Sequence, residues 1–176
     1  MIRTSILAAG LAAGLAVALL GTPAIAQSAS DDKAAAQKFL TDAMEGDYAE
    51  IAVGKLAQEK GTNQAVKDFG AKLVADHTAH LDKAKQVASQ LGVKDPGGAS
   101  ILENAEYLKL KVLSGSTFDR TFAKDMVSDH ENAIEEFRKE AVNSGPVGEF
   151  AKESLPTLEQ HLQIAQSLTL QTTGSK

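Results

Sequence analysis

Apolar residues recur three and four positions apart along almost the whole chain from residue 31 to about residue 170. This spacing places them on one face of an α-helix, and the alternation typical of a half-buried β-strand is missing. Clusters of glycine, proline, serine and asparagine interrupt the pattern between the periodic segments. The sequence therefore predicts an all-α chain, with helices at 33–60, 63–91, 100–113, 116–142 and 147–170 and a disordered tail at 171–176.

The lengths of these segments predict how they pack. Four are long and the third, at 100–113, is short. Tight connections make the first two helices one antiparallel hairpin and the last two another. The short helix and its linker are long enough to return the chain to the end where the second helix starts. We therefore expect residues 33–170 to form a ferritin-like four-helix bundle with a short crossover helix. An up-and-down bundle that includes the short helix is the alternative.

Residues 1–26 have the order of a secretory signal peptide. Arg3 supplies a positive charge, and residues 6–20 are uncharged and apolar. Residues 24–26 read Ala-Ile-Ala, which puts small residues at −3 and −1 of a cut after Ala26. We expect a disordered stretch at 27–32 and an exported product, periplasmic or secreted, with no stable membrane span after cleavage. A retained membrane anchor is the alternative, because the apolar run approaches the length of a spanning helix.

Composition excludes several kinds of function. The chain has no cysteine, which rules out disulfide scaffolds, zinc ribbons, thiol nucleophiles, iron–sulfur clusters and thioether-attached haem. Its 18 Lys and Arg against 23 Asp and Glu give a net charge of −5, so we expect no nucleic-acid partner. No Ser/His/Asp nucleophile arrangement, phosphate loop or dinucleotide fingerprint is present. We expect no catalytic residues, leave open whether the chain is an enzyme, and expect any partner to be an envelope protein or a second copy of the chain.

Three of the four histidines lie on the apolar faces of the predicted helices. His77, His130 and His161 occupy these faces in the second, fourth and fifth helices, respectively. The first helix carries Asp47 in its apolar stripe, with Glu50 one helical step away. The three histidines and Asp47 all lie near the middle of their helices. They should therefore meet in one layer of the bundle, whichever way each helix runs.

Such a layer needs partners, because burying these polar groups unpaired would cost several kcal/mol. They must bind one another, water or an ion. Imidazole and carboxylate ligands suit iron, manganese, zinc or copper, so the sequence predicts a metal site at His77, His130 and His161 with Glu50 or Asp47. The alternative is a metal-free polar layer that fixes helix register in a structural or partner-binding module. The Glu-x-x-His spacing of ferritin-like di-iron sites does not occur, so no di-iron carboxylate centre of the usual kind is expected.

A weak internal repeat relates two of these histidines and suggests duplicated helical pairs. At an offset of 53 residues, 69–77 aligns with 122–130, and His77 then corresponds to His130. The repeat gives His80 no histidine counterpart. We therefore expect His80 at the rim of the bundle or in solvent.

Two glycines lie close to the predicted layer. Gly46 and Gly54 fall within the first predicted helix, where glycine is less favourable than alanine. Their presence indicates either a close approach of another helix or room for a ligand near Asp47 and Glu50.

Four short segments resemble one known family. They are AEIAVGKLA at 49–57, NQAVKDFG at 63–70, LVADHT at 73–78 and LPTLEQHL at 155–162. They are similar to motifs of the domain-of-unknown-function 4142 family, and the resemblance covers about residues 35 to 170. It implies an exported bacterial protein with a ferritin-like bundle and no settled biochemical activity. Glu50, His77, His130 and His161 match the family's motif positions, but the resemblance supplies no roles for them.

Overall fold

The computed structural model describes the backbone of residues 23–174 and the side chains of residues 32–172. This part of the chain contains five helices and no strand. The helices are α1 (Pro23–Lys60), α2 (Gln64–Gln90), α3 (Ile101–Lys111), α4 (Gly115–Glu140) and α5 (Pro146–Gly174). The all-α prediction is therefore confirmed.

Two helix ends differ from the predicted ones by more than two residues. α1 begins at Pro23 and so includes the backbone of 27–32, because proline suits the first turn of a helix and no glycine or further proline follows until Gly46. α5 continues to Gly174, since no glycine or proline precedes that residue after the predicted end at 170. Most of the predicted signal peptide, residues 1–22, lies outside the described residues.

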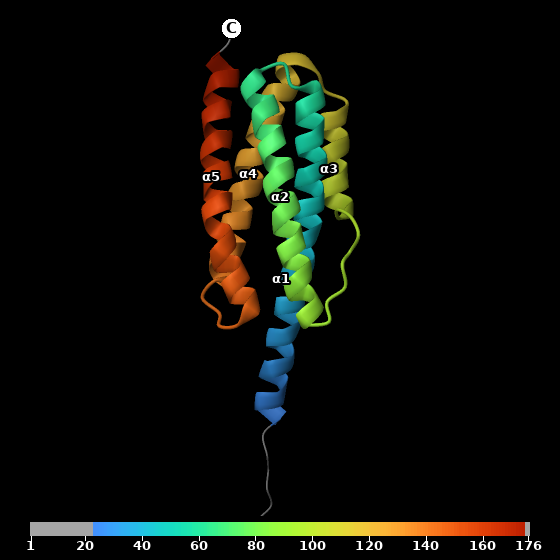
Figure 1. Ribbon diagram of the computed structural model, residues 1–176, viewed down its shortest axis with the longest axis vertical. Helices are drawn as coiled ribbons and strands as arrows, with labels where there is room; N and C mark the ends of the chain where they lie inside the picture. Colours follow the sequence, from blue (N-terminus) through green and yellow to red (C-terminus); the bar gives the residue numbers. More distant parts are fainter. Residues whose placement is uncertain (1–22, 175–176) are drawn as a thin grey trace, which may run out of the picture.

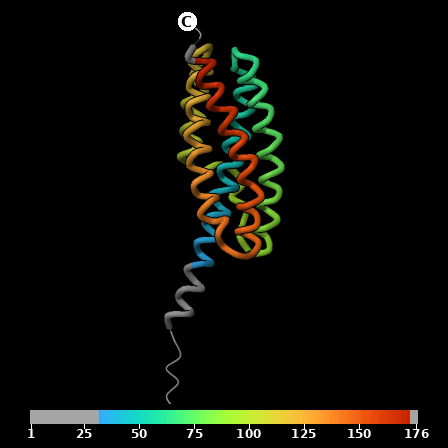
Figure 2. Tube along the Cα trace, turned by 90° about the vertical axis from the view of Figure 1, so that its left-hand side faces the viewer, coloured from blue at the N-terminus to red at the C-terminus, as the bar shows by residue number. Residues whose placement is uncertain are grey.

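The topology is that of a ferritin-like bundle (Figure 1). α1 and α2 form one antiparallel hairpin and α4 and α5 form the second, while α3 lies outside the bundle against α1. The linker after α2 and α3 together return the chain to the end where α2 began, so α2 and α4 run parallel. In the view of Figure 2, α5 crosses the bundle at a tilt between α4 and α2. The predicted crossover arrangement is confirmed.

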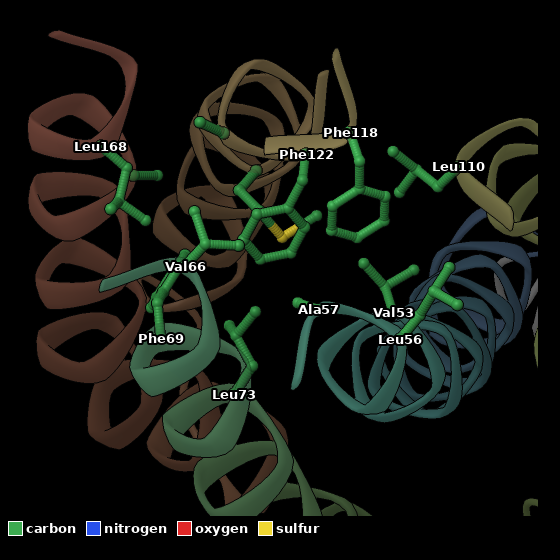
Figure 3. Close-up of a cluster of buried hydrophobic side chains, with 13 residues drawn as sticks. Val53, Leu56, Ala57, Val66, Phe69, Leu73, Leu110, Phe118, Phe122 and Leu168 are labelled. Atoms are coloured by element: carbon green, nitrogen blue, oxygen red, sulfur yellow. The ribbon is translucent and has the colours of Figure 1, made fainter. Parts of the chain in front are cut away.

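Two hydrophobic clusters fill the bundle, one near each end. The first lies toward the α1–α2 connection and includes Phe69 and Phe122, whose rings meet edge to face with centroids 5.9 Å apart (Figure 3). The second lies toward the α4–α5 connection and includes Leu40 and Phe137. Between the two clusters each of the four bundle helices contributes a buried polar residue at the same level, which is where the candidate site lies.

The α1–α2 connection is closed by a buried carboxylate from α4. Asp119 is 3% exposed and accepts hydrogen bonds from the backbone N–H groups of Thr62 and Asn63, at 3.0 and 2.9 Å. The Asn63 side chain in turn caps α2 by accepting from the N–H of Ala65 at 2.9 Å. These bonds tie α4 to the start of α2 and so help to set the relative height of His77 and His130.

Among the described helices, none combines the length and apolar character needed to cross a bilayer.

Candidate metal centre

The three inward-facing histidines meet between the two hydrophobic clusters. His77 of α2, His130 of α4 and His161 of α5 are 6%, 1% and 0% exposed. One potential ligand nitrogen from each ring lies within 4.8 Å of the other two. His130 Nε2 and His161 Nδ1 are 3.2 Å apart. The structure thus brings together three residues that are 53 and 31 positions apart in the sequence.

The second nitrogen of each ring faces an oxygen that can only accept a hydrogen bond. His77 Nδ1 lies 2.8 Å from Asp47 Oδ1, and His161 Nε2 lies 2.7 Å from Asp76 Oδ2. His130 Nδ1 lies 2.9 Å from the backbone carbonyl four residues earlier in α4. In a neutral ring, each of these nitrogens therefore carries the hydrogen. The nitrogens that then have no hydrogen are His77 Nε2, His130 Nε2 and His161 Nδ1.

The electrostatic environment keeps two of these rings neutral. Burial, with the neighbouring rings of His77 and His161, lowers the pKa of His130 to about 3. Burial also lowers the pKa of His161 to about 4, even though the hydrogen bond to Asp76 acts in the opposite direction. At neutral pH no proton therefore lies between His130 Nε2 and His161 Nδ1, and two lone pairs face each other. His77 Nε2 is buried with no hydrogen-bond partner among the described residues.

Asp76 is the outer partner of His161 and stays ionised. Burial alone would raise the pKa of its carboxyl group, but hydrogen bonds from Lys72 and His161 outweigh burial and lower this pKa below its ordinary value. Lys72 Nζ lies 2.8 Å from Asp76 Oδ2. Asp76 is therefore a carboxylate that accepts from the imidazole.

Asp47 orients two histidines rather than one. Besides His77, it contacts His80, whose Nδ1 lies 2.8 Å from both carboxylate oxygens. His80 Nε2 lies 2.8 Å from Ser154 Oγ. We expected His80 at the rim or in solvent, but its side chain is only 15% exposed, because α5 packs over this turn of α2.

Asp47, His80 and Ser154 form a Ser/His/Asp arrangement that the sequence order did not reveal. The Ser154 hydroxyl donates to the carbonyl of Phe150, 2.7 Å away within α5. The hydroxyl oxygen also lies within hydrogen-bond distance of His80 Nε2, so the row links Asp47 of α1, His80 of α2 and Ser154 of α5.

Glu50 lies apart from the three converging nitrogens. Its Oε1 is 4.0 Å from His130 Nδ1, on the side of the ring that faces away from His161, and Oε2 is buried without a partner among the described residues. Burial, followed by the charge of Asp129, raises the pKa of Glu50 well above its ordinary value. Of the two carboxylates predicted as ligands, Glu50 thus lies outside both groups that could hold a metal ion, whereas Asp47 forms the second of these groups with His77 and His80.

Three residues of the site were not among the predicted ligands: Asp76, His80 and Ser154. Each had a local signal. Asp76 adjoins an inward histidine and so faces the neighbouring helix, His80 lies three residues after His77 on the same face of α2, and Ser154 interrupts the apolar stripe of the last predicted helix. None of these signals identifies the partner, which comes from another helix.

Comparison with known proteins supports the fold and assigns the family. No curated protein matches the sequence. The crystal structure of a DUF305 fragment from Deinococcus radiodurans is similar, with a TM-score of 0.69 and 12% sequence identity, covering 78% of this chain and 96% of that chain. At this identity the likeness shows the fold alone. The sequence matches the family named "Domain of unknown function (DUF4142)" over residues 21–168. The chain therefore belongs to the DUF4142 family.

Proposed function

We propose that this protein binds a divalent transition metal through His77, His130 and His161. One observation carries the proposal: one nitrogen of each buried ring faces a carbonyl or carboxylate oxygen, so in the neutral ring the other nitrogen has a lone pair for a metal. Histidines that ligate metals almost always have such an outer partner, which fixes the ring and raises its basicity. A metal-free layer in which the rings bind one another would need hydrogen bonds between them, and neutral His130 and His161 lack the proton for one.

The donor set favours zinc or copper over manganese. Imidazole nitrogen suits zinc, copper and iron, whereas manganese prefers oxygen ligands. In a tetrahedral zinc site with bonds of about 2.0–2.1 Å, ligand nitrogens are about 3.3–3.4 Å apart. The 3.2 Å between His130 Nε2 and His161 Nδ1 is close to that spacing. Asp47 and Asp76 supply two negative charges nearby, which would balance a divalent ion.

The test is elemental analysis of untagged protein, since a His-tag would itself bind metal. We expect about one transition-metal ion per chain, lost in His77→Ala and in His161→Ala. His80→Gln tests the neighbouring group of Asp47, His77 and His80, whose potential ligand atoms also lie within 4.8 Å of one another. Metal lost in this variant but kept in His161→Ala would place the ion in that group instead. A chain that takes up no iron, manganese, zinc or copper on incubation would overturn the proposal. His130→Leu would then fold as well as the wild type, as expected for a structural or partner-binding module.

We also propose that the metal-binding protein acts outside the cytoplasm, as a non-catalytic or weakly redox-active protein of the cell envelope. The signal-peptide order of residues 1–26 supports this location. N-terminal sequencing of the protein recovered from cells should begin at Gln27. A product that starts at Met1 and stays in the cytoplasm would contradict export without affecting the metal proposal.

A further inference from the structure

A cavity of about 420 Å³ lies between α1, α3 and α4 and reaches the histidine cluster. His77 and His130 form part of its inner wall. Carboxylates dominate the rest of its polar lining, and no lysine or arginine of the described residues lines it. These carboxylates are Asp42, Glu45, Asp47, Glu50, Glu103, Glu106, Asp129 and Glu136. The cavity thus joins an acidic stretch of surface to two of the three proposed ligands.

Nearby bases pair with only part of the negative charge of this cavity, since Asp42 is bound to Lys38. Lys109 lies near Asp129, but its ammonium group is 2.7 Å from Asp125. A recess lined by charges of one sign and low-dielectric walls raises the local concentration of the opposite ion.

Glu50 is the carboxylate at the inner end of this path. Its side chain is 12% exposed, and Oε2 is buried with no partner among the described residues. Its other oxygen lies 4.0 Å from the ring of His130. Within the described part of the chain, no three of the outer carboxylates bring oxygens within 4.8 Å of one another. A cation attracted to the mouth of the cavity is therefore not retained there by a preformed carboxylate site.

The opposite side of the cluster differs in size and in charge. A cavity of about 160 Å³ between α2 and α5 also reaches His77 and His161, but Lys83 lines it together with Glu153 and Asp76. Asp76 is already bound to Lys72 and to His161. This smaller, charge-balanced opening does not favour a cation.

We propose that divalent cations reach the three histidines through the acidic cavity between α1, α3 and α4, with Glu50 as the last acidic side chain on the way. This inference rests on the proposed metal-binding function. The inference predicts that Glu50 acts on the rates of metal binding. A residue on the entry route lowers the free-energy barrier that the ion crosses both when it enters and when it leaves. Association and dissociation should then slow by the same factor when Glu50 is changed, and the affinity should remain.

The test is stopped-flow transfer of Zn²⁺ from a fluorescent chelator to the metal-free full chain, with the dissociation rate measured by transfer to a stronger chelator. Glu50→Gln and Glu103→Gln/Glu106→Gln should each slow zinc uptake by about five-fold or more, with dissociation slowed equally and Kd within about three-fold of wild type. Glu153→Gln is the matched control, because it removes one carboxylate from the opposite cavity and should leave both rates unchanged. Asp129→Asn serves as a second inner variant if thermal unfolding shows that Glu50→Gln is not folded.

The results of these experiments distinguish failure of the proposed entry route from failure of the proposed metal site. Normal zinc uptake by the Glu50 and Asp129 variants, with binding still lost in His161→Ala, overturns the route and leaves the proposed function standing. A Kd weakened more than about ten-fold with faster dissociation in Glu50→Gln makes Glu50 a ligand and also overturns the route. A wild-type chain that takes up no zinc overturns both the entry route and the proposed metal-binding function.

Discussion

At the scale of single residues, the chemistry of this bundle depends on which nitrogen of each histidine carries hydrogen. An imidazole whose N–H is held by an acceptor presents its other nitrogen as a fixed lone pair. Asp47 and Asp76 impose this state on His77 and His161, and a backbone carbonyl of α4 imposes it on His130. The outer partners are therefore as much a part of the site as the rings.

Asp76→Ala tests this dependence. The change removes the acceptor that holds His161 Nε2, so the ring can adopt either tautomer or rotate. We expect zinc affinity to fall by about 10–100-fold while the stoichiometry stays unchanged. Competition titration against a chelator measures the affinity. Asp82→Ala is the control, because Asp82 is an exposed acid on the same helix. Equal losses of zinc affinity in the two variants would show a general effect of charge instead.

The lowered pKa values predict how stability varies with pH in the metal-free protein. His130 has a pKa of about 3 when folded and 6.5 as its ordinary value, so the unfolded chain binds the proton first as the pH falls. Its contribution to stability is complete above about pH 6.5 and is lost progressively toward pH 3. The free energy of unfolding of wild type relative to His130→Leu should therefore fall with decreasing pH in this window. Denaturant titrations at several pH values measure it, and a constant difference would contradict the lowered pKa.

At the scale of elements, close packing of α1 against α2 brings Asp47 and His77 within hydrogen-bond distance. Gly54 and Gly70 face each other where these helices approach. A Cβ atom at Gly54 would lie 2.7 Å from the carbonyl oxygen of Gly70, and one at Gly70 would lie 2.6 Å from that of Gly54. The sequence left two explanations for Gly46 and Gly54, and the structure separates them: Gly54 allows the close approach, while Gly46 lines the acidic cavity.

Alanine substitutions distinguish these two glycines. Gly54→Ala should destabilise the fold by about 1–3 kcal/mol, because backbone must move to admit the methyl group. Gly46→Ala should stabilise it by about 0.5–1 kcal/mol, since its nearest contact is Glu103 Oε1 at 3.7 Å and alanine is the better helix former. Thermal unfolding of both variants gives the comparison. Equal changes in stability would show that the contact between α1 and α2 at Gly54 can admit a methyl group.

Helix faces were predictable because they depend on spacing within one segment. The positions of His77, His130 and His161 on apolar faces followed from that spacing, and their common level followed from the mid-helix position of each. Contacts across helices were not predictable in the same way. The pairing of Asp76 with His161, and of His80 with Ser154, depends on how far each helix is rotated and on which helix lies beside it. Those quantities are set by the packing of both hairpins together.

At the scale of the whole molecule, the polar layer divides the interior into two hydrophobic clusters that share the same four helices. Each cluster has aromatic and aliphatic contacts of its own, whereas the layer contains lone pairs that face each other. The centre of the bundle is therefore the part whose stability a bound cation would change most. α3 contributes none of the three ligands.

Metal binding should accordingly stabilise the entire bundle. At a free zinc concentration 100-fold above Kd, the expected gain is about 2.7 kcal/mol, or a rise in Tm of about 5–10 °C for a chain of this size. Differential scanning calorimetry measures it, and His161→Ala should show no rise. Hydrogen exchange should slow at mid-helix in α1, α2, α4 and α5 but not in α3. Protection confined to one hairpin would contradict a site that joins the two.

The shared level of the three histidines also constrains how the length of this chain can change during evolution. One residue inserted into an α-helix turns everything beyond it by about 100° and advances it by about 1.5 Å. A single insertion between Asp119, which ties α4 to the α1–α2 connection, and His130 would turn that ring away from its two neighbours while leaving the anchored end in place. Insertions and deletions should therefore accumulate in the linker between α2 and α3, whose length affects neither the rotation nor the height of a ligand.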